Sequence, residues 1–138
     1  MNILFLDIDG VVNCATTTQR HRGCIGIDPC MALIVGNIVD KTNVKVVLSS
    51  TWRLWEETKQ EVEAQVVKLY DVTPHLGGLD RGYEIKEWLD QHPNVERYAI
   101  LDDDSDMLLE QMDHFFQTTW KEGINQTIAG KVISYFLD

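Results

Sequence analysis

The sequence predicts an α/β fold in which a mostly parallel sheet lies between two layers of helices. Two observations support this prediction. Short continuous apolar runs, typical of strands buried on both faces, recur along the chain. Between them lie segments whose apolar residues repeat with the period of a helix. Because strands and helices alternate through all 138 residues, without a repeat or a linker, we expect one three-layer domain over residues 1–138.

The strands are expected where the apolar runs occur. Ile3–Leu6 and Val44–Leu48 fit buried strands, Tyr98–Leu101 fits a third, and His114–Thr118 is a candidate fourth. Val67–Val72 fits the end of a helix or the beginning of a short strand equally well. Three strands are therefore clear, and two further segments are candidates.

The helices are bounded by capping residues and prolines. Asp28 and Pro29 predict an N-cap followed by proline at the first helical position. A second helix is expected from Leu54 to about Lys68, and a third through Ile85–Leu89, which Pro93 prevents from continuing. Two more helices are expected, a short one over Asp106–Gln111 and a terminal one over Ile128–Leu137.

Three of the apolar runs end on polar residues that can carry chemistry. The first is followed by Asp7-Ile8-Asp9-Gly10, the second by Ser49-Ser50-Thr51 and the third by Asp102-Asp103-Asp104. Open α/β sheets bind ligands at the carboxyl ends of their strands. Clustered carboxylates are costly unless they are protonated, solvated or bound to a cation, and hard oxygen ligands suit Mg²⁺. If these strands are neighbours, the sequence predicts a magnesium site at this edge.

The same residues indicate phosphoryl transfer. Asp7 can attack phosphorus to form an aspartyl-phosphate, and Asp9 can protonate the leaving oxygen and later activate water. Gly10 lets the chain turn away sharply, which leaves backbone N–H groups for phosphate oxygens. Ser49 can donate a hydrogen bond to the transferred group. We therefore interpret Asp7 as the nucleophile of a magnesium-dependent site.

These motifs resemble those of a known superfamily. Phe5–Gly10, Val46–Ser49 and Ile100–Asp103 are similar, in order and spacing, to motifs one, two and four of the haloacid dehalogenase (HAD) superfamily. The D-x-D form resembles its phosphatase branch. The resemblance spans nearly the whole chain and implies the HAD-like version of the predicted α/β fold.

The resemblance also implies roles for individual carboxylates. Asp7 is the nucleophile and Asp9 the general acid/base. The metal is held by the Asp7 side chain, the Asp9 backbone carbonyl and the pair Asp102 and Asp103. Within that pair Asp103 is the favoured direct ligand. Asp106 is a competing ligand, because Asp102 and Asp106 also form a D-x-x-x-D arrangement.

A cation is expected against the nucleophile and the phosphate. Arg81, just before the third helix, is the favoured residue, and Lys86, deeper in that helix, is its rival. Ser50 and Arg53 are further candidates for substrate binding, although Ser50 or Thr51 also fits the N-cap of the following helix.

The intervals between the motifs are filled by core helices, which leaves no room for a full cap domain over the site. An open site favours large substrates. The runs Ser49–Arg53 and Arg81–Ile85, followed by Trp88-Leu89, are similar to small HAD domains linked with RNA repair and to the 3′-phosphatase domain of polynucleotide kinases. This resemblance implies hydrolysis of nucleotide or polynucleotide 3′-phosphate ends. A phosphoprotein phosphatase and a non-catalytic phosphate-binding module stay open as alternatives.

Two aromatic and basic features are consistent with a nucleotide substrate. Trp52 and Trp55 can stack on a base, although core or rim packing is the usual role of such residues. Arg20-His21-Arg22 can contact substrate or form a solvated loop.

The composition limits the partners. A net charge of −10 disfavours binding along a nucleic-acid backbone but does not exclude recognition of an end. No apolar run fits a transmembrane helix or a signal peptide, so we expect a cytosolic protein without a membrane partner. In a cytosolic chain its three cysteines are expected to be reduced. A zinc site of Cys24, Cys30 and His21 is disfavoured, because no fourth ligand is evident. The sequence does not indicate an oligomeric state.

Overall fold

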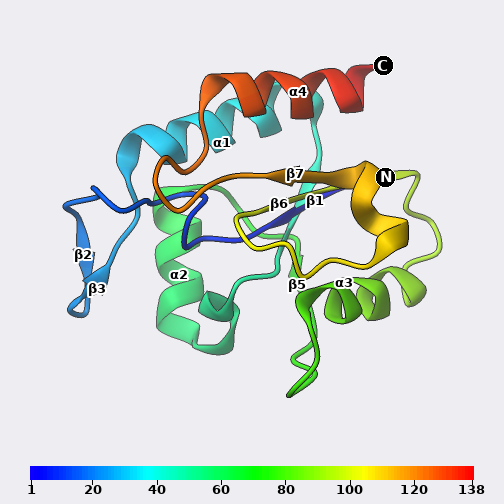
Figure 1. Ribbon diagram of the computed structural model, residues 1–138, viewed down its shortest axis with the longest axis horizontal. Coiled ribbons are helices and arrows are strands. Elements are labelled where there is room, and N and C mark those ends of the chain that lie inside the picture. Colours follow the sequence, from blue (N-terminus) through cyan, green and yellow to red (C-terminus); the bar gives the residue numbers. More distant parts are fainter.

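A five-stranded parallel sheet organises the computed structural model, which describes residues 1–138 (Figure 1). β1 (Asn2–Leu6) is the central strand and pairs with both β4 (Lys45–Leu48) and β6 (Arg97–Asp102). The edge strands are β5 (Asp71–Val72), beside β4, and β7 (Phe115–Gln117), beside β6. The predicted α/β class with a parallel sheet is confirmed, and both candidate segments contain a strand.

Helices cover both faces of this sheet. α1 (Pro29–Thr42) leads from β1 to β4 and lies beside α4 (Gln126–Leu137) on one face, while α3 (Arg81–Asp90) leads from β5 to β6 on the other (Figure 1). Crossovers between parallel strands are right-handed, so connections that run in opposite directions across the sheet place their helices on opposite faces. The remaining helical elements are η1 (Thr51–Leu54), α2 (Glu56–Gln65) and η2 (Leu109–His114).

Alternating residues of β1 build a core on each side of the sheet. Leu4 and Leu6 belong to a cluster of 20 buried residues shared with α1 and α4. Ile3 and Phe5 belong to a cluster of six that includes Trp88 of α3. Since both faces are covered, the buried residues Ile3–Leu6 are all apolar, which is why this sequence is recognisable as a buried strand.

The helix boundaries agree with the sequence in part. The Asp28 side chain accepts a hydrogen bond from the Cys30 backbone N–H at 2.9 Å and caps α1, as expected. The helix expected from Leu54 to about Lys68 is interrupted, because Trp55 is extended (φ −128°, ψ 139°) between η1 and α2. α2 ends at Gln65, earlier than expected.

The short helix expected over Asp106–Gln111 lies three residues later, as the 3₁₀ helix η2. The reason is that Asp106 is engaged elsewhere. Its carboxylate accepts a hydrogen bond from the Arg81 backbone N–H at 3.1 Å, and its carbonyl accepts one from the Gly82 N–H at 3.2 Å. Asp106 thus caps α3 from a distant part of the chain and is held outside the helix expected there.

One small insertion follows β1. It contains an antiparallel hairpin of β2 (Arg20–His21) and β3 (Cys24–Ile25), in a stretch that the sequence indicated only as irregular. No large cap covers the carboxyl ends of the strands, in agreement with the sequence. No helix of the fold combines the length and apolar character needed to cross a membrane.

The three cysteines are free. Cys14 is buried, and Cys24 and Cys30 are exposed. The group of side chains that is close enough to hold a metal ion consists of aspartates and does not include His21, Cys24 or Cys30. The structure therefore gives no support to a zinc site at these residues.

Candidate active site

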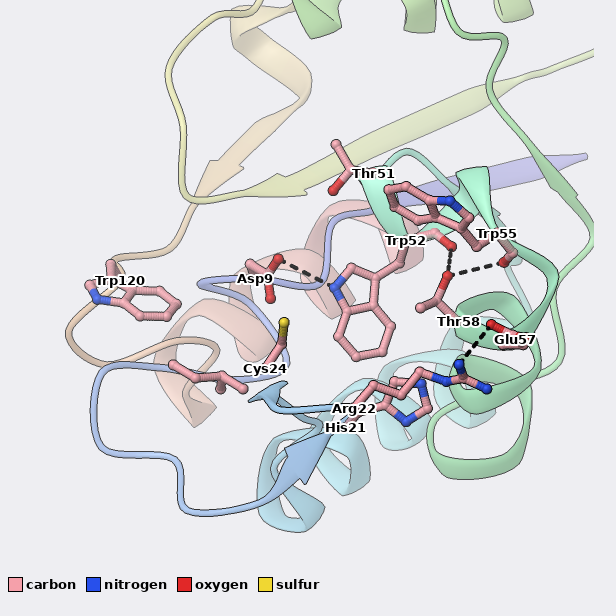
Figure 2. Close-up of a pocket in the computed structure, with 11 residues that line it drawn as sticks. Asp9, His21, Arg22, Cys24, Thr51, Trp52, Trp55, Glu57, Thr58 and Trp120 are labelled. Carbon is pink, nitrogen blue, oxygen red and sulfur yellow. Dashed lines mark hydrogen bonds and ion pairs between the residues drawn. The ribbon is translucent and has the colours of Figure 1, made fainter.

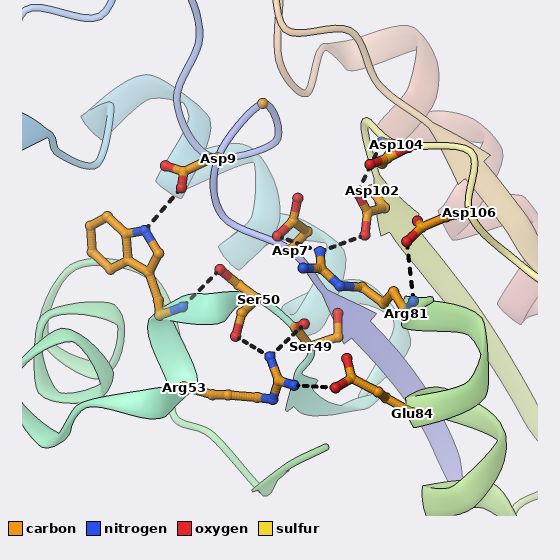
Figure 3. A network of polar contacts seen from close by, with 12 residues as sticks. Asp7, Asp9, Ser49, Ser50, Arg53, Arg81, Glu84, Asp102, Asp104 and Asp106 are labelled. Atoms are coloured by element: carbon orange, nitrogen blue, oxygen red, sulfur yellow. Dashed lines mark hydrogen bonds and ion pairs between the residues drawn. The ribbon is translucent and has the colours of Figure 1, made fainter. Parts of the chain in front are cut away.

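The ends of three adjacent strands bring the predicted motifs together (Figure 3). Leu6 is in register with Leu48 on one side and with Leu101 on the other. The backbone N–H of Asp7 donates to the Leu101 carbonyl, and that of Ser49 donates to the Leu6 carbonyl, each at 3.0 Å. The residues that follow the three apolar runs therefore lie at the same level, at the carboxyl end of the sheet.

Arg81 joins two of the aspartates at this edge. Its Nη1 lies 2.9 Å from Asp7 Oδ1 and 2.9 Å from Asp102 Oδ2. Asp102 is fully buried, and Asp7 is only 5% exposed. Burial opposes the charge of Arg81, but Asp7 and Asp102 together raise the pKa of its guanidinium, so it is a permanent cation. Arg81 rather than Lys86 is thus the cation in contact with the proposed nucleophile.

Three carboxylates at the edge can share one cation. Asp7, Asp102 and Asp103 each offer an oxygen, and these oxygens lie within 4.8 Å of one another. Burial and the neighbouring Asp102 raise the pKa of Asp7 well above its usual range, and the same two causes raise the pKa of Asp103. When all three are ionised, Arg81 balances one charge and two remain. A hard divalent cation matches both this charge and the all-oxygen donor set.

Gly10 makes room for this cluster. It has a φ of +82°, and a Cβ atom there would lie 2.0 Å from Asp103 Oδ2. Any larger residue would therefore displace Asp103. The turn at Gly10 was expected to leave backbone N–H groups for phosphate, but the N–H of Gly10 itself is not among them, because it donates to Asn13 Oδ1 at 2.9 Å. The Gly10 carbonyl in turn accepts a hydrogen bond from Thr118 Oγ1 at 2.6 Å.

Asp9 points away from the three carboxylates toward a neighbouring pocket (Figures 2 and 3). Its Oδ1 accepts from Asn13 Nδ2 at 2.9 Å, and its Oδ2 accepts from Trp52 Nε1 at 3.3 Å. Asn13 is itself fixed, since it is fully buried and also donates to the Gly26 carbonyl. Asp9 is exposed, and two side-chain donors hold it in the orientation expected of a group that meets solvent and substrate.

Comparison with known families agrees with this geometry. Residues 3–129 match the family described as the HAD domain in Swiss Army Knife RNA repair proteins. The chain belongs to this family. A search of curated proteins found no match to it. Membership confirms the HAD resemblance seen in the sequence and supports a phosphatase-like function for the domain. HAD domains generally use Mg²⁺, in keeping with the three-aspartate group.

The two serines after β4 differ in their surroundings in this HAD domain. Ser49 is fully buried, and its hydroxyl has no hydrogen-bond partner in the chain. An unpaired buried hydroxyl at the sheet edge suits the predicted contact to a phosphoryl group. Ser50 Oγ accepts from the Trp52 N–H at 3.1 Å and caps η1, which is the capping role considered from the sequence. Its hydroxyl proton is still available for a substrate.

Arg53 does not bind substrate in this geometry, contrary to the sequence-based assignment. Its side chain is buried, and all five of its N–H groups donate within the domain, so none remains for a phosphate. It holds the loop after β4 against α3 and the segment after β5. The acceptors are the carbonyl oxygens of Ser49, Ser50, Thr73 and Pro74 and the carboxylate of Glu84.

Lys86 is also displaced from the role proposed for it. Its Nζ lies 2.8 Å from Asp90 Oδ2, in an exposed pair along α3. Because α3 begins at Arg81, that residue faces the site while Lys86, more than one turn later, faces solvent. Asp106, the alternative metal ligand, lies outside the three-carboxylate group, and its Oδ2 accepts a hydrogen bond at the N-terminus of α3.

Several residues of the site carried no signal in the sequence. Asn13, Thr118 and Glu84 hold Asp9, Gly10 and Arg53, but isolated polar residues of these types occur in any loop or helix. Trp120 lies beyond β7 and lines the pocket beside Asp9. Its exposure next to strand ends that lie far from it in sequence could be seen only in three dimensions.

We expect the metal-free domain to gain stability when one carboxylate of the cluster is neutralised. An acid with a raised folded-state pKa makes folding less favourable as pH rises from its unfolded pKa toward its folded pKa. The metal-free domain should therefore lose stability from about pH 4 upward, and Mg²⁺ should restore it most at neutral pH. Asp103→Asn should raise the thermal midpoint in EDTA by a few degrees and reduce the shift caused by Mg²⁺.

The matched control is Asp104→Asn, because Asp104 is exposed and lies outside the three-carboxylate group. Thermal scans with EDTA or Mg²⁺ at pH 5 and pH 7.5 give the comparison. An unchanged Mg²⁺ shift in Asp103→Asn would remove Asp103 from the proposed metal site.

Proposed function

We propose that this HAD domain is a magnesium-dependent phosphomonoester hydrolase that acts on nucleotide or polynucleotide phosphate ends through an aspartyl-phosphate. The observation that carries the proposal is the contact of Arg81 with both Asp7 and Asp102, beside a third carboxylate. A solvated acidic turn would not hold a partly buried arginine between two of its carboxylates. A cation beside three carboxylates suits a site for an anionic substrate and a divalent cation.

The residues fit the metal that the family implies. Asp7, Asp103 and Asp102 would hold Mg²⁺, with the Asp9 carbonyl as the fourth protein ligand proposed from the resemblance. When bound, the ion neutralises phosphate charge and lowers the repulsion between Asp7 and the substrate.

The chain's own groups supply the covalent steps. An Asp7 carboxylate oxygen forms a bond to phosphorus while the ester P–O bond breaks, and Asp9 gives its proton to the leaving oxygen. Water then attacks the phosphorus, Asp9 accepts its proton, and the Asp7–phosphorus bond breaks to release phosphate. Arg81 keeps Asp7 ionised and oriented, in competition with its burial.

Donors for the phosphoryl oxygens are present at the same edge. The Ser49 hydroxyl is unpaired, and the backbone N–H groups of Asp9 and Ser50 make no hydrogen bond within the domain. A phosphoryl group placed against Asp7 would take these donors. The Gly10 N–H is not one of these donors, because it donates to the Asn13 side chain.

The substrate class is supported by the family and by the absence of a large cap. The family is defined by domains of RNA repair proteins, and an open sheet edge admits the end of a polymer. A phosphoprotein phosphatase would use the same groups, so substrate preference must be measured.

The test is phosphate release from a panel of substrates with Mg²⁺ and with EDTA. The panel contains 3′- and 5′-phosphorylated oligonucleotides, mononucleotides and phosphopeptides. We expect Mg²⁺-dependent release that is fastest from nucleotide phosphates, with the 3′ ends preferred. Clear preference for phosphopeptides would reassign the substrate, and no release from any ester would favour a phosphate-binding module.

A further inference from the structure

A pocket opens directly beside Asp9, on the side away from the three carboxylates (Figure 2). Its volume is about 480 Å³, within the range of roughly 300–1,000 Å³ that small-molecule sites occupy. Its walls come from four separate parts of the chain: the loop after β1, the hairpin β2–β3, the region from η1 into α2, and the loop after β7. None of the roles described so far uses this pocket.

Three of the four tryptophans line it. Trp52 is nearly buried, and its Nε1 donates to Asp9, whereas Trp55 and Trp120 are 59% and 44% exposed. In Figure 2 Asp9 lies between Trp120 and Trp52. His21 stacks on Trp52, with ring centroids 5.7 Å apart, and fixes the position of that indole. Exposed indoles gathered around one concave site are unusual on a soluble domain and mark a binding surface.

The basic residues near the pocket are already engaged. Arg22 Nη1 lies 3.3 Å from Glu57 Oε2, and His21 Nδ1 lies 3.4 Å from Glu61 Oε2. Arg20 donates to backbone carbonyls of its own loop. In the cluster Arg20-His21-Arg22, considered from the sequence as a substrate contact, two members therefore face an acid, which leaves few cations for a phosphate backbone. Together with the net charge of −10, this favours an occupant that is held by its aromatic surface.

The position of Asp9 indicates which part of a substrate enters. In an in-line displacement the leaving oxygen departs from phosphorus on the side opposite the nucleophile, and the general acid must reach that oxygen, so the leaving group lies beside Asp9 and away from Asp7. That side is the tryptophan pocket. We propose that this pocket binds the base of the terminal nucleoside, stacked on Trp55 and Trp120, and that this single base, not the polymer backbone, provides most of the recognition. The inference rests on the proposed phosphatase activity and adds which part of the leaving group the domain recognises.

The test compares substrates that differ in the length of the polymer or in the presence of the base. They are a nucleoside 3′-monophosphate, a 3′-phosphorylated oligonucleotide, and 1,2-dideoxyribose 3-phosphate, which lacks a base. We expect kcat/KM for the first two to agree within a few-fold and to exceed that of the abasic compound by about 5- to 150-fold, the value of one base stacked on aromatic side chains. The ratio of oligonucleotide to abasic kcat/KM should be the same in 50 and 200 mM NaCl. Contacts to the phosphate backbone of the oligonucleotide would instead weaken with salt and lower this ratio.

Two variants and a control locate the effect. Trp55→Ala and Trp120→Ala should each lower the ratio of nucleotide to abasic activity several-fold. Tyr70→Ala is the control, because Tyr70 is 48% exposed, contacts Lys45 and lies outside the pocket. A ratio near one in the wild type, or an unchanged ratio in both tryptophan variants, would overturn the pocket assignment and leave the phosphatase activity standing.

A binding measurement separates the pocket from the chemistry. Adenosine should quench the tryptophan fluorescence of the wild-type domain in a saturable way, and ribose should not. Adenosine binding without hydrolysis of any ester would contradict the proposed activity but not the pocket. If adenosine does not bind and the base does not affect kcat/KM, the pocket assignment is wrong. If a phosphotyrosine peptide is preferred over every nucleotide, the pocket binds a tyrosine ring and the assignment to a base is wrong.

Discussion

Asp7→Asn is expected to lower kcat/KM for a phosphate ester by a factor on the order of 10⁴–10⁶, with Mg²⁺ present. The amide has nearly the same shape as the carboxylate, so it should keep a contact to Arg81. It cannot act as the anionic nucleophile, and without that group no aspartyl-phosphate can form. Release of phosphate under single-turnover and steady-state conditions measures the loss.

The fold should survive this change. Because burial and Asp102 raise the pKa of Asp7, removing its charge should leave the metal-free domain at least as stable as the wild type. Asp104→Asn again serves as the nearby control, with activity close to that of the wild type. Beryllium fluoride, which mimics the aspartyl-phosphate, should bind the wild type and not Asp7→Asn. Full activity in Asp7→Asn would show that another group is the nucleophile.

Arg53→Met is expected to cause the largest loss of stability, about 3–5 kcal/mol in the free energy of unfolding. The substitution removes five donated hydrogen bonds and leaves the carboxylate of Glu84 buried without its cation. Activity should fall as well, since Arg53 holds the carbonyl oxygens of Ser49 and Ser50, and with them the loop that carries the phosphate donors. Urea denaturation followed by circular dichroism gives the free energy.

The comparison variant is Lys86→Met, which breaks the exposed pair with Asp90. Exposed pairs contribute about 0–1 kcal/mol, so this variant should unfold close to the wild type. The double variant Arg53→Met/Glu84→Gln should lose less stability than the two single variants added together, because the buried charge is then absent. Equal effects of Arg53→Met and Lys86→Met would mean that the Arg53 contacts carry no special weight.

Much of the fold could be predicted because its signals are local. Strand segments buried on both faces are apolar, as in Ile3–Leu6 of β1, Val46–Leu48 of β4 and Ala99–Leu101 of β6. The cap of α1 depends on two adjacent residues, Asp28 and Pro29. The elements that were misplaced depend on contacts that are distant in sequence. η2 begins late because Asp106 is held at α3, which precedes it by more than twenty residues.

The candidate site divides in the same way. Asp7, Ser49 and Asp102 were found because each ends a recognisable strand, and register alone brings strand ends together. Arg53 was misassigned because an arginine beside a phosphate motif has the same sequence signature whether its donors face the ligand or the protein. Its five internal acceptors come from segments between residues 49 and 84.

The sequence by itself determined which polar residues follow each buried strand and what chemistry their carboxylates can perform, since both depend on residue type and short-range pattern. Only the tertiary structure decided which cation reaches Asp7, which N–H groups are left for a phosphate, and where Asp9 points. Those outcomes depend on the packing of α3 against the sheet and on buried polar groups such as Asn13, which pair with whatever partner the fold brings near. The tryptophan pocket is the clearest case, because its walls meet only when four distant segments come together around the end of the sheet.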